Sequence, residues 1–374
     1  MRLGTCIALE LAIAAGSVGG VWVAASRASA LVSGRPPDHD MAMAVIAAPV
    51  AAAAPPTPPA SPLVPLERSH LAIAAPPERP ALPVTVFGAP DDELLAPIAA
   101  APITKVKLNH GGTSLSLRID FASGARAAFK PLQIHPQSDP RREIAAYRID
   151  RLLGIGRVPP AKSAAFAVDD IVAAMEPSGR AYAASRIAEE AIARQGVLIG
   201  EVSWWIPEIK LVRLGGRLID EPDGVATWSS YLQAGAVMPG ELRPLLAQIA
   251  TVIVFDVLID NSDRWSGNNT QGSLDGRTLY FMDNTLAFST YTLGHATNLS
   301  KLNRIQVFPR VLVGKLRGLT VEAISAALGG EDSLLGPLLT DGEIQAIIAR
   351  RDHLLEYIDR LIAELGEDAV LALP

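Results

Sequence analysis

The chain has 374 residues, a formal net charge of −6 and a pI of about 5.6, with no long basic run. These properties exclude a general nucleic-acid-binding surface, which needs clustered positive charge. The single cysteine, Cys6, lies in the amino-terminal apolar segment, so the chain beyond it can form neither an intramolecular disulfide nor a cysteine-based zinc site. The length suffices for one large domain or a two-lobed one.

Residues 1–31 have the pattern of an export signal. Arg2 supplies a thin positive start, residues 11–26 carry no charge, and Ala28-Ser29-Ala30 fits a small-residue cleavage site. An uncleaved membrane anchor is the second interpretation, although the charge-free run is shorter than the roughly 20 residues that span a bilayer comfortably. A disordered or helical alanine-rich extension is the third.

Residues 32–101 are dominated by Pro and Ala, a composition that favours an extended, disordered tether over a packed unit. The folded domain is therefore expected to begin near Pro102. A signal followed by a tether and a domain predicts work outside the cytoplasm, in a secreted, periplasmic or outward-facing membrane-tethered protein. An exported domain without disulfides would suit a bacterial envelope.

Residues 103–131 alternate apolar and polar side chains, with breaks at His110-Gly111-Gly112 and Ser123-Gly124. This pattern predicts successive antiparallel strands joined by tight turns. We count Gly111 and Gly112, in the first turn, among the candidate nucleotide-binding residues. Lys130 ends the third strand and is either an edge charge or a phosphate ligand.

A helix is predicted over residues 138–154, with Asp139 as its N-cap, Pro140 at the first helical position and Gly154 as its stop. Glu143 lies in the first turn, where a carboxylate favours the helix dipole. It could also be the partner of Lys130. A strand lysine followed by a helix glutamate is how protein kinases hold the α- and β-phosphates of ATP.

Further strands are expected at residues 164–168 and 181–185. Residues 200–212 are apolar and aromatic, and they are interpreted as a connector between two lobes. Near the carboxyl end, residues 340–366 begin with a capping box and follow helical spacing, which predicts a packing helix of the second lobe.

An apolar run at residues 241–259 predicts a buried helix, which breaks into the polar loop "DNSDRWSGNN". A turn at Asp275-Gly276 and a short strand ending at Asp283 follow. Phosphoryl transfer needs a carboxylate that accepts the proton of the acceptor hydroxyl, and a divalent metal ion that neutralises the charge of the phosphates. Asp263 would be that base, and Asn268 and Asp283 would offer oxygen ligands to the metal.

Two other interpretations of this loop stay open. It could be an acidic calcium loop, although it lacks the EF-hand periodicity and the terminal glutamate. It could also be a hydrogen-bonded surface turn, since Asp and Asn side chains favour turns.

Two blocks, "FKP…EIAAYRIDRLLGIGRVPP" and "VFDVLIDNSDR…LYFMDNTLAFS", carry a family resemblance. In this order, the chain resembles the secretory-pathway kinases of the four-jointed and Golgi casein kinase type over most of residues 103–365. The resemblance implies an α+β, two-lobed protein-kinase-like fold. A small β-rich N-lobe with one key helix would occupy residues 102–205, and a mainly helical C-lobe with the catalytic and metal loops would occupy residues 206–374.

The resemblance also implies ATP with Mn²⁺ or Mg²⁺ and a hydroxyl acceptor on a protein or a glycan. Lys130 would bind phosphate, and Glu143 would pair with it and face the metal site. Asp263 would be the catalytic aspartate and Asp283 the metal-binding one. Asn268 stands where the more distant type II phosphatidylinositol 4-kinases and HipA-type kinases place a metal-binding asparagine.

The chain departs from the family at three points. Trp265 follows the Asp-Arg pair where the family usually has His, and Thr285 stands where Gly is usual after the metal aspartate and its asparagine. The animal members are disulfide-bonded, and this domain cannot be. Trp265 and Thr285 leave a pseudokinase scaffold as one alternative to an active protein or glycan kinase. A lipid or small-molecule kinase is a second, because the loop "NSDRWSGNN" resembles that of phosphoinositide kinases, and a metal-binding envelope domain is a third.

Overall fold

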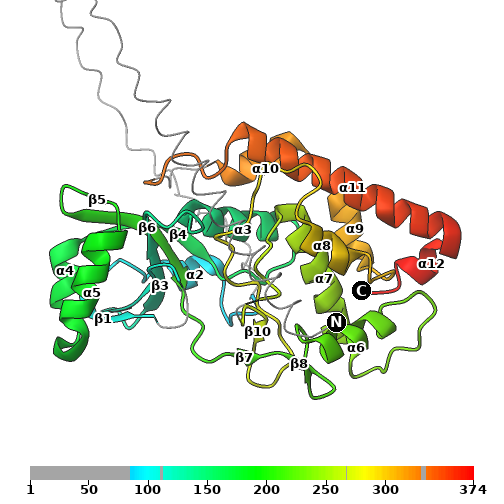
Figure 1. Cartoon of the computed structure of the whole chain (residues 1–374), viewed down its shortest axis with the longest axis horizontal. Coiled ribbons are helices and arrows are strands. Elements are labelled where there is room, and N and C mark those ends of the chain that lie inside the picture. The colour runs from blue at the N-terminus through cyan, green and yellow to red at the C-terminus, as the bar shows by residue number, and fades with distance from the viewer. Residues whose placement is uncertain (1–84, 110–112, 267, 330–333) are drawn as a thin grey trace, which may run out of the picture. The chain divides into compact units, whose positions relative to one another are not determined.

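The computed structural model describes residues 85–109, 113–266, 268–329 and 334–374. The expected export signal and candidates Gly111 and Gly112 lie outside these ranges. The described residues belong to one compact unit. Figure 1 shows a sheet with flanking helices at one end of this unit and a mainly helical lobe at the other, which confirms the expected α+β kinase-like fold.

The N-lobe is built on an antiparallel sheet in the order β1-β2-β3-β6-β4, with β5 paired to β6. Burial alternates along the central strands, so that one row of apolar side chains, including Leu117, Ile119 and Phe129, forms the core of this lobe. The three strands expected within 103–131 are confirmed. The strands are β1 Ile103–Leu108, β2 Leu117–Phe121, β3 Arg126–Pro131, β4 Ala161–Ala167, β5 Ala193–Arg194 and β6 Val197–Trp204.

The key helix of this lobe, α3, runs Pro140–Leu152. Asp139 caps it, since its carboxylate accepts a 3.1 Å hydrogen bond from the backbone N–H of Arg141. Gly154 follows in the left-handed region at φ 71°, so both predicted ends are confirmed. The other helices here are α2 Asp91–Leu95, α4 Val168–Ala173 and α5 Pro177–Glu190.

Three expectations differ from the structure. Residues 181–185 lie within α5 and not in a strand, because Ala183 and Ile187 are the buried face of a helix started by Pro177. Residues 200–204 belong to β6, so only the next few residues can connect the lobes. The expected tether is too long at its carboxyl end, since residues 85–101 are folded and bury Phe87 and Ile98.

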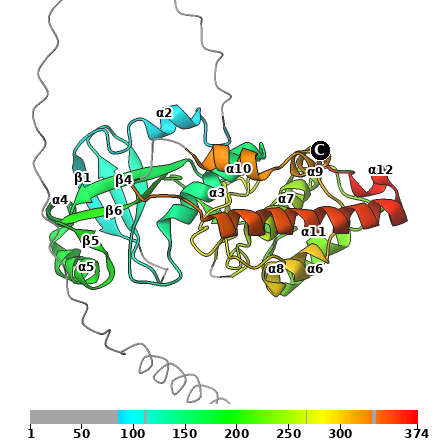
Figure 2. The same ribbon diagram turned by 90° about the horizontal axis from the view of Figure 1, so that it is seen from above.

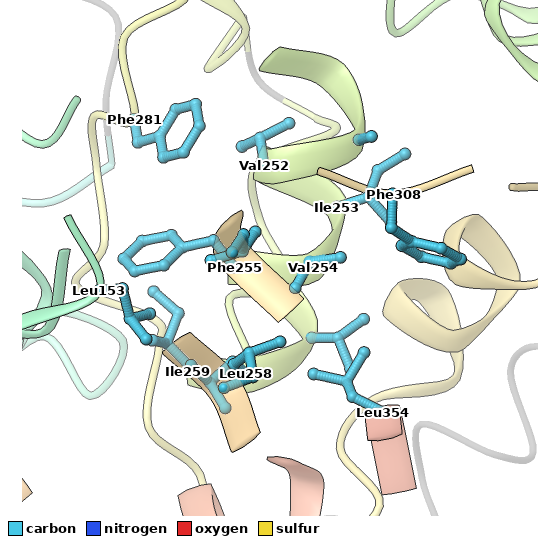
Figure 3. Packing of buried hydrophobic residues seen from close by; sticks show 14 of the residues in the cluster. Leu153, Val252, Ile253, Val254, Phe255, Leu258, Ile259, Phe281, Phe308 and Leu354 are labelled. Atoms are coloured by element: carbon cyan, nitrogen blue, oxygen red, sulfur yellow. The ribbon is translucent and has the colours of Figure 1, made fainter. Parts of the chain in front are cut away.

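The C-lobe is organised around α7, Arg243–Ile259, which is buried on nearly all sides. Figure 3 shows Val252, Phe255 and Leu258 of this helix pointing in different directions into apolar neighbours. Such an all-round apolar helix is the centre of a core. Around it lie α6 Pro222–Tyr231, α8 Ala296–Leu302, α9 Arg310–Arg317, α10 Val321–Leu328, α11 Asp341–Leu365 and α12 Glu367–Val370.

The capping box at the start of α11 is present, with Thr340 and Glu343 bonded reciprocally. Figure 2 shows this long helix along one side of the lobe, with α10 beside α3 of the N-lobe. Arg148 of α3 donates to the carbonyls of Leu328, 3.0 Å, and Gly329, 2.9 Å, so the end of α10 is tied to the key helix. No described helix is long and apolar enough to cross a bilayer.

The expected strand at residues 278–283 shrinks to one bridge, between Gly272 and Leu279. The backbone there bonds to other loops: the N–H of Phe281 reaches the carbonyl of Arg157, and the carbonyl of Met282 accepts from Arg264. Asp283 itself has a φ of 57°, which no strand accommodates. The short strands of this lobe are β7 Lys210–Leu211, β8 Arg213–Leu214, β9 Arg217–Leu218 and β10 Gln271–Gly272.

Candidate active site

Three of the sequence-predicted residues meet between the lobes. The Nζ of Lys130, at the end of β3, lies 2.8 Å from Oε1 of Glu143 and 2.8 Å from Oδ1 of Asp283. Glu143 comes from the first turn of α3 and Asp283 from a loop 153 positions along the chain from Lys130. The Lys130 and Glu143 side chains are nearly buried, whereas that of Asp283 is 43% exposed and faces solvent.

The electrostatics of this cluster favour its charged form. Burial works against the ammonium of Lys130, but Asp283 and Glu143 outweigh it and hold the pKa of Lys130 above its ordinary value. The ammonium in turn holds the pKa of Asp283 below its ordinary value. A permanent ammonium beside a partly open carboxylate can bind phosphate oxygens and a divalent cation together.

Buried amide and guanidinium groups fix Asp283 in this position. Asn261 donates to the Asp283 carbonyl at 3.0 Å and to Oδ1 of Asn284 at 3.1 Å. Arg264, fully buried, donates to the same Asn284 oxygen at 2.6 Å and pairs with Asp256 at 3.3 Å. The loop after α7 is therefore rich in polar side chains because these side chains fix the loop that carries Asp283.

Asp260 plays a similar part away from the cleft. Fully buried, it accepts the backbone N–H of His295 at 2.7 Å and the side-chain amide of Asn298 at 3.1 Å, and Ser289 also donates to it. These bonds hold residues 289–298, which follow Asp283, against the end of α7. Neither Asp256 nor Asp260 lines the cavity between the lobes.

Asp263 is half-buried and its carboxylate is held at both oxygens. Ser266 Oγ donates to Oδ1 at 2.6 Å, and Asn269 Nδ2 donates to Oδ2 at 2.9 Å. Asn268, the expected metal ligand, is exposed and has a φ of 67°. Of these two neighbouring asparagines, Asn269 and not Asn268 lines the cavity.

A cavity of about 230 Å³ opens between the lobes next to this cluster. Lys130, Glu143 and Asp283 form its polar end. Its remaining wall is mostly apolar and aromatic and comes from both lobes. The apolar and aromatic wall residues are Ala128, Val158, Pro159, Ala161, Trp204, Trp205, Ile206, Ile209 and Met282. An apolar slot that ends in an ammonium and carboxylates suits a flat heterocycle attached to phosphates.

Glu201 was missed by sequence reasoning, which treated its segment as a connector. It is the direct cross-strand neighbour of Lys130 and is fully buried. Burial, followed by the charge of Glu143, raises the pKa of Glu201 to about 8. The signal that could have found it is a glutamate in an otherwise apolar strand pattern.

The donor chemistry fits a divalent ion only in part. Within the described ranges, no group of three or more His, Cys, Asp or Glu is arranged to hold a metal. Asp283 nevertheless keeps Oδ2 free of any hydrogen bond to described residues, and Asn269 and Glu143 lie along the same cavity. Two carboxylates, an amide and phosphate oxygens are ligands that Mg²⁺ and Mn²⁺ accept.

No protein-family model matches the chain, but sequence relatives include proteins named as kinases. Glycosaminoglycan xylosylkinase of Homo sapiens is 24% identical over 314 residues, covering 73% of this chain and 76% of the relative. That of Danio rerio is 24% identical over 318 residues, with 74% and 76% covered. Extracellular serine/threonine protein kinase FAM20C of Homo sapiens is 35% identical over 82 residues, covering 18% of this chain and 14% of the relative.

Solved structures agree. The Golgi casein kinase superposes with a TM-score of 0.59 at 17% identity, covering 75% of this chain and 77% of that one. Its form with Mn/ADP bound gives 0.57 at 17% identity, with 75% and 78% covered. Hydra Fam20 with sugar gives 0.52 at 18% identity, with 74% and 90% covered.

The fold is therefore that of the Golgi casein kinase, which confirms the kinase-like fold that the sequence blocks predicted. In sequence the chain is similar to proteins named glycosaminoglycan xylosylkinase and, over a shorter stretch, to the kinase FAM20C.

Proposed function

We propose that this protein is an ATP-dependent phosphotransferase that phosphorylates a hydroxyl group of a glycan or a protein. The observation that carries the proposal is the double ion pair of Lys130 with Glu143 and Asp283, at 2.8 Å each, at the polar end of an apolar cavity. Kinases need this strand lysine, helix glutamate and metal-loop aspartate together.

In this account Lys130 binds the α- and β-phosphates, and Glu143 holds the ammonium in place. Asp283 and Glu143 would hold Mn²⁺ or Mg²⁺, with Asn268 or Asn269 as a further oxygen ligand. The ion would supply positive charge against the phosphates. Asp263, oriented by Asn269 and Ser266, accepts the proton of the acceptor hydroxyl.

A sugar hydroxyl is the favoured acceptor. The two relatives that cover about three quarters of the chain carry the name glycosaminoglycan xylosylkinase, whereas the similarity to the serine/threonine kinase FAM20C covers 18% of the chain. Xylose-containing glycans are therefore the first acceptors to test, followed by Ser/Thr peptides and lipid headgroups.

We place the activity outside the cytoplasm, with residues 1–31 as an export signal or membrane tether. The support is the amino-terminal sequence pattern and the relatives named as extracellular or Golgi kinases. Fractionation of cells that express the full chain separates a secreted, an envelope-bound and a cytoplasmic protein.

A pseudokinase is the second candidate, suggested by Trp265 and Thr285. Trp265 packs on Trp228, with ring centroids 5.7 Å apart, and Thr285 Oγ1 lies 3.2 Å from Oδ1 of Asp283. Neither residue displaces Lys130, Asp263 or Asp283. Nucleotide-dependent thermal stabilisation without turnover would favour the pseudokinase.

The deciding experiment incubates the purified full chain with γ-labelled ATP, Mn²⁺ and the acceptor panel, and detects labelled product by mass. We expect transfer to one acceptor class and its loss in the double variant Asp263→Ala with Asp283→Ala. Transfer that survives both substitutions would rule out the mechanism.

A further inference from the structure

Residues 85–98, here called the N-terminal strap, pack against the residues that join the two lobes. The strap holds α2, cyan in Figures 1 and 2, which lies beside the N-lobe sheet. Its first large side chain, Phe87, is 8% exposed. The Phe87 ring is stacked on Tyr280 at 5.7 Å and meets Trp204 edge-on at 5.8 Å. Tyr280 precedes the metal loop, and Trp204 ends β6.

The strap is fastened along its length to the N-lobe. Asp91 pairs with Arg151 of α3 at 2.6 Å and accepts the hydroxyl of Tyr147 at 3.1 Å. Lys162 of β4 donates to the carbonyl of Leu95 at 2.8 Å. Ile98, 1% exposed, then enters the N-lobe core. The strap is therefore an ordered part of the kinase-like unit, although its composition is typical of linkers.

Phe87 lies directly behind the wall of the cavity. It forms one apolar cluster with Ile206, Trp204 and Met282, and these three residues also line the cavity. Met282 is the residue immediately before Asp283. The cluster includes residues of both lobes, so its packing sets how far the Trp204–Ile206 side of the cavity stands from the Met282–Asp283 side.

We propose that the strap is a structural part of the nucleotide site, with Phe87 as a positioning residue that sets the width of the apolar slot. Removal of the Phe87 ring would leave a void behind Trp204 and Met282, and the two walls would lose their common support. The inference rests on the proposed function in one respect, which is that the cavity takes a nucleotide.

The test measures binding of Mn²⁺ with ADP to the full chain by calorimetry, without any acceptor, and the KM for ATP and kcat separately. Phe87→Ala removes the ring, and Phe87→Leu keeps apolar volume as a rescue. Val86→Ala alters the neighbouring residue, which is 42% exposed. Leu361→Ala in α11 weakens a buried C-lobe contact that does not line the cavity.

Phe87→Ala is expected to weaken nucleotide binding roughly three- to thirtyfold and to raise KM in proportion, with kcat within about twofold. Phe87→Leu should recover part of this loss. Val86→Ala and Leu361→Ala should bind as the wild type does, although Leu361→Ala lowers the melting temperature.

Equal nucleotide binding by the wild type and Phe87→Ala overturns the strap proposal alone. Equal weakening by Leu361→Ala also overturns it, because the loss would then reflect general destabilisation. A wild-type chain that binds no nucleotide with Mn²⁺ overturns the proposed function and the strap proposal together.

Discussion

Asn284 joins the two lobes at the site: its side-chain Nδ2 donates to Oε2 of Glu143 at 3.1 Å. The other Glu143 oxygen receives Lys130, so both oxygens of this carboxylate are held. Asn284 is itself fully buried and accepts from Asn261 and Arg264 of the loop that follows α7. One amide thus connects Glu143 of α3 to the loop of Asp283 and to the loop of Asp263.

Asn284→Ala should lower kcat about 10- to 100-fold, because Glu143 and Asp283 lose the partner that fixes their relative position. It also leaves Arg264 and Asn261 short of an acceptor, so the melting temperature should fall. Steady-state kinetics at saturating ATP and Mn²⁺ check the first effect. Asn303→Ala, an exposed asparagine after α8, is the control. A kcat within twofold of the wild type would contradict this role.

Single substitutions can distinguish the roles of the neighbouring Asn268 and Asn269. Asn269→Ala should reduce kcat about tenfold or more, since Asn269 holds Asp263 at 2.9 Å and lines the cavity. Asn268→Ala should change kcat by less than about threefold, because that side chain is exposed. The reverse order, with a raised Mn²⁺ requirement for Asn268→Ala, would restore Asn268 as the metal ligand that the loop spacing suggests.

The pKa of Glu201 makes stability depend on pH in a definite direction. The unfolded chain releases this proton near pH 4.5 and the folded chain near pH 8, so between these values the folded state binds more protons. The free energy of unfolding should therefore fall as pH rises through this range, by up to about 1.4 kcal/mol per pH unit from this group. Below pH 4.5 Glu201 is protonated in both the folded and the unfolded chain, so it no longer makes stability depend on pH.

Glu201→Gln removes this titration. The difference in the free energy of unfolding between the variant and the wild type should shift in favour of the variant when the pH is raised from 5 to 8. Urea denaturation without metal or nucleotide measures this difference. Glu364→Gln, on the exposed face of α11, should follow the wild-type curve at both pH values. Parallel pH dependence for Glu201→Gln and the wild type would show that Glu201 is ionised in the folded state.

Local patterns made much of the fold predictable. Strand alternation with tight turns gave β1, β2 and β3, and capping residues gave both ends of α3 and the start of α11. The order of kinase elements along the chain also singled out Lys130, Glu143 and Asp283, which the structure brings together. The role of Asp263 stays a prediction.

The missed features depend on tertiary contacts. Residues 181–185 form a helix because Ala183 and Ile187 are buried in the N-lobe core on one helical face, which outweighs their short apolar alternation. The sequence did not reveal the strap, because it lies in a Pro/Ala-rich region and only Phe87 and Ile98 are its buried large side chains. Glu201 has no local signal for its contact with Lys130, which arises from strand register.

The most direct test of the central claim is Mn²⁺ binding measured by electron paramagnetic resonance with and without ADP. If Lys130, Glu143 and Asp283 form one site for a metal nucleotide, the wild type with ADP will bind Mn²⁺ beyond the Mn²⁺–ADP complex that forms without protein, and Asp283→Asn and Lys130→Met will each abolish this protein-bound species. Bound Mn²⁺ that is independent of ADP, or that persists unchanged in Asp283→Asn, would contradict the claim.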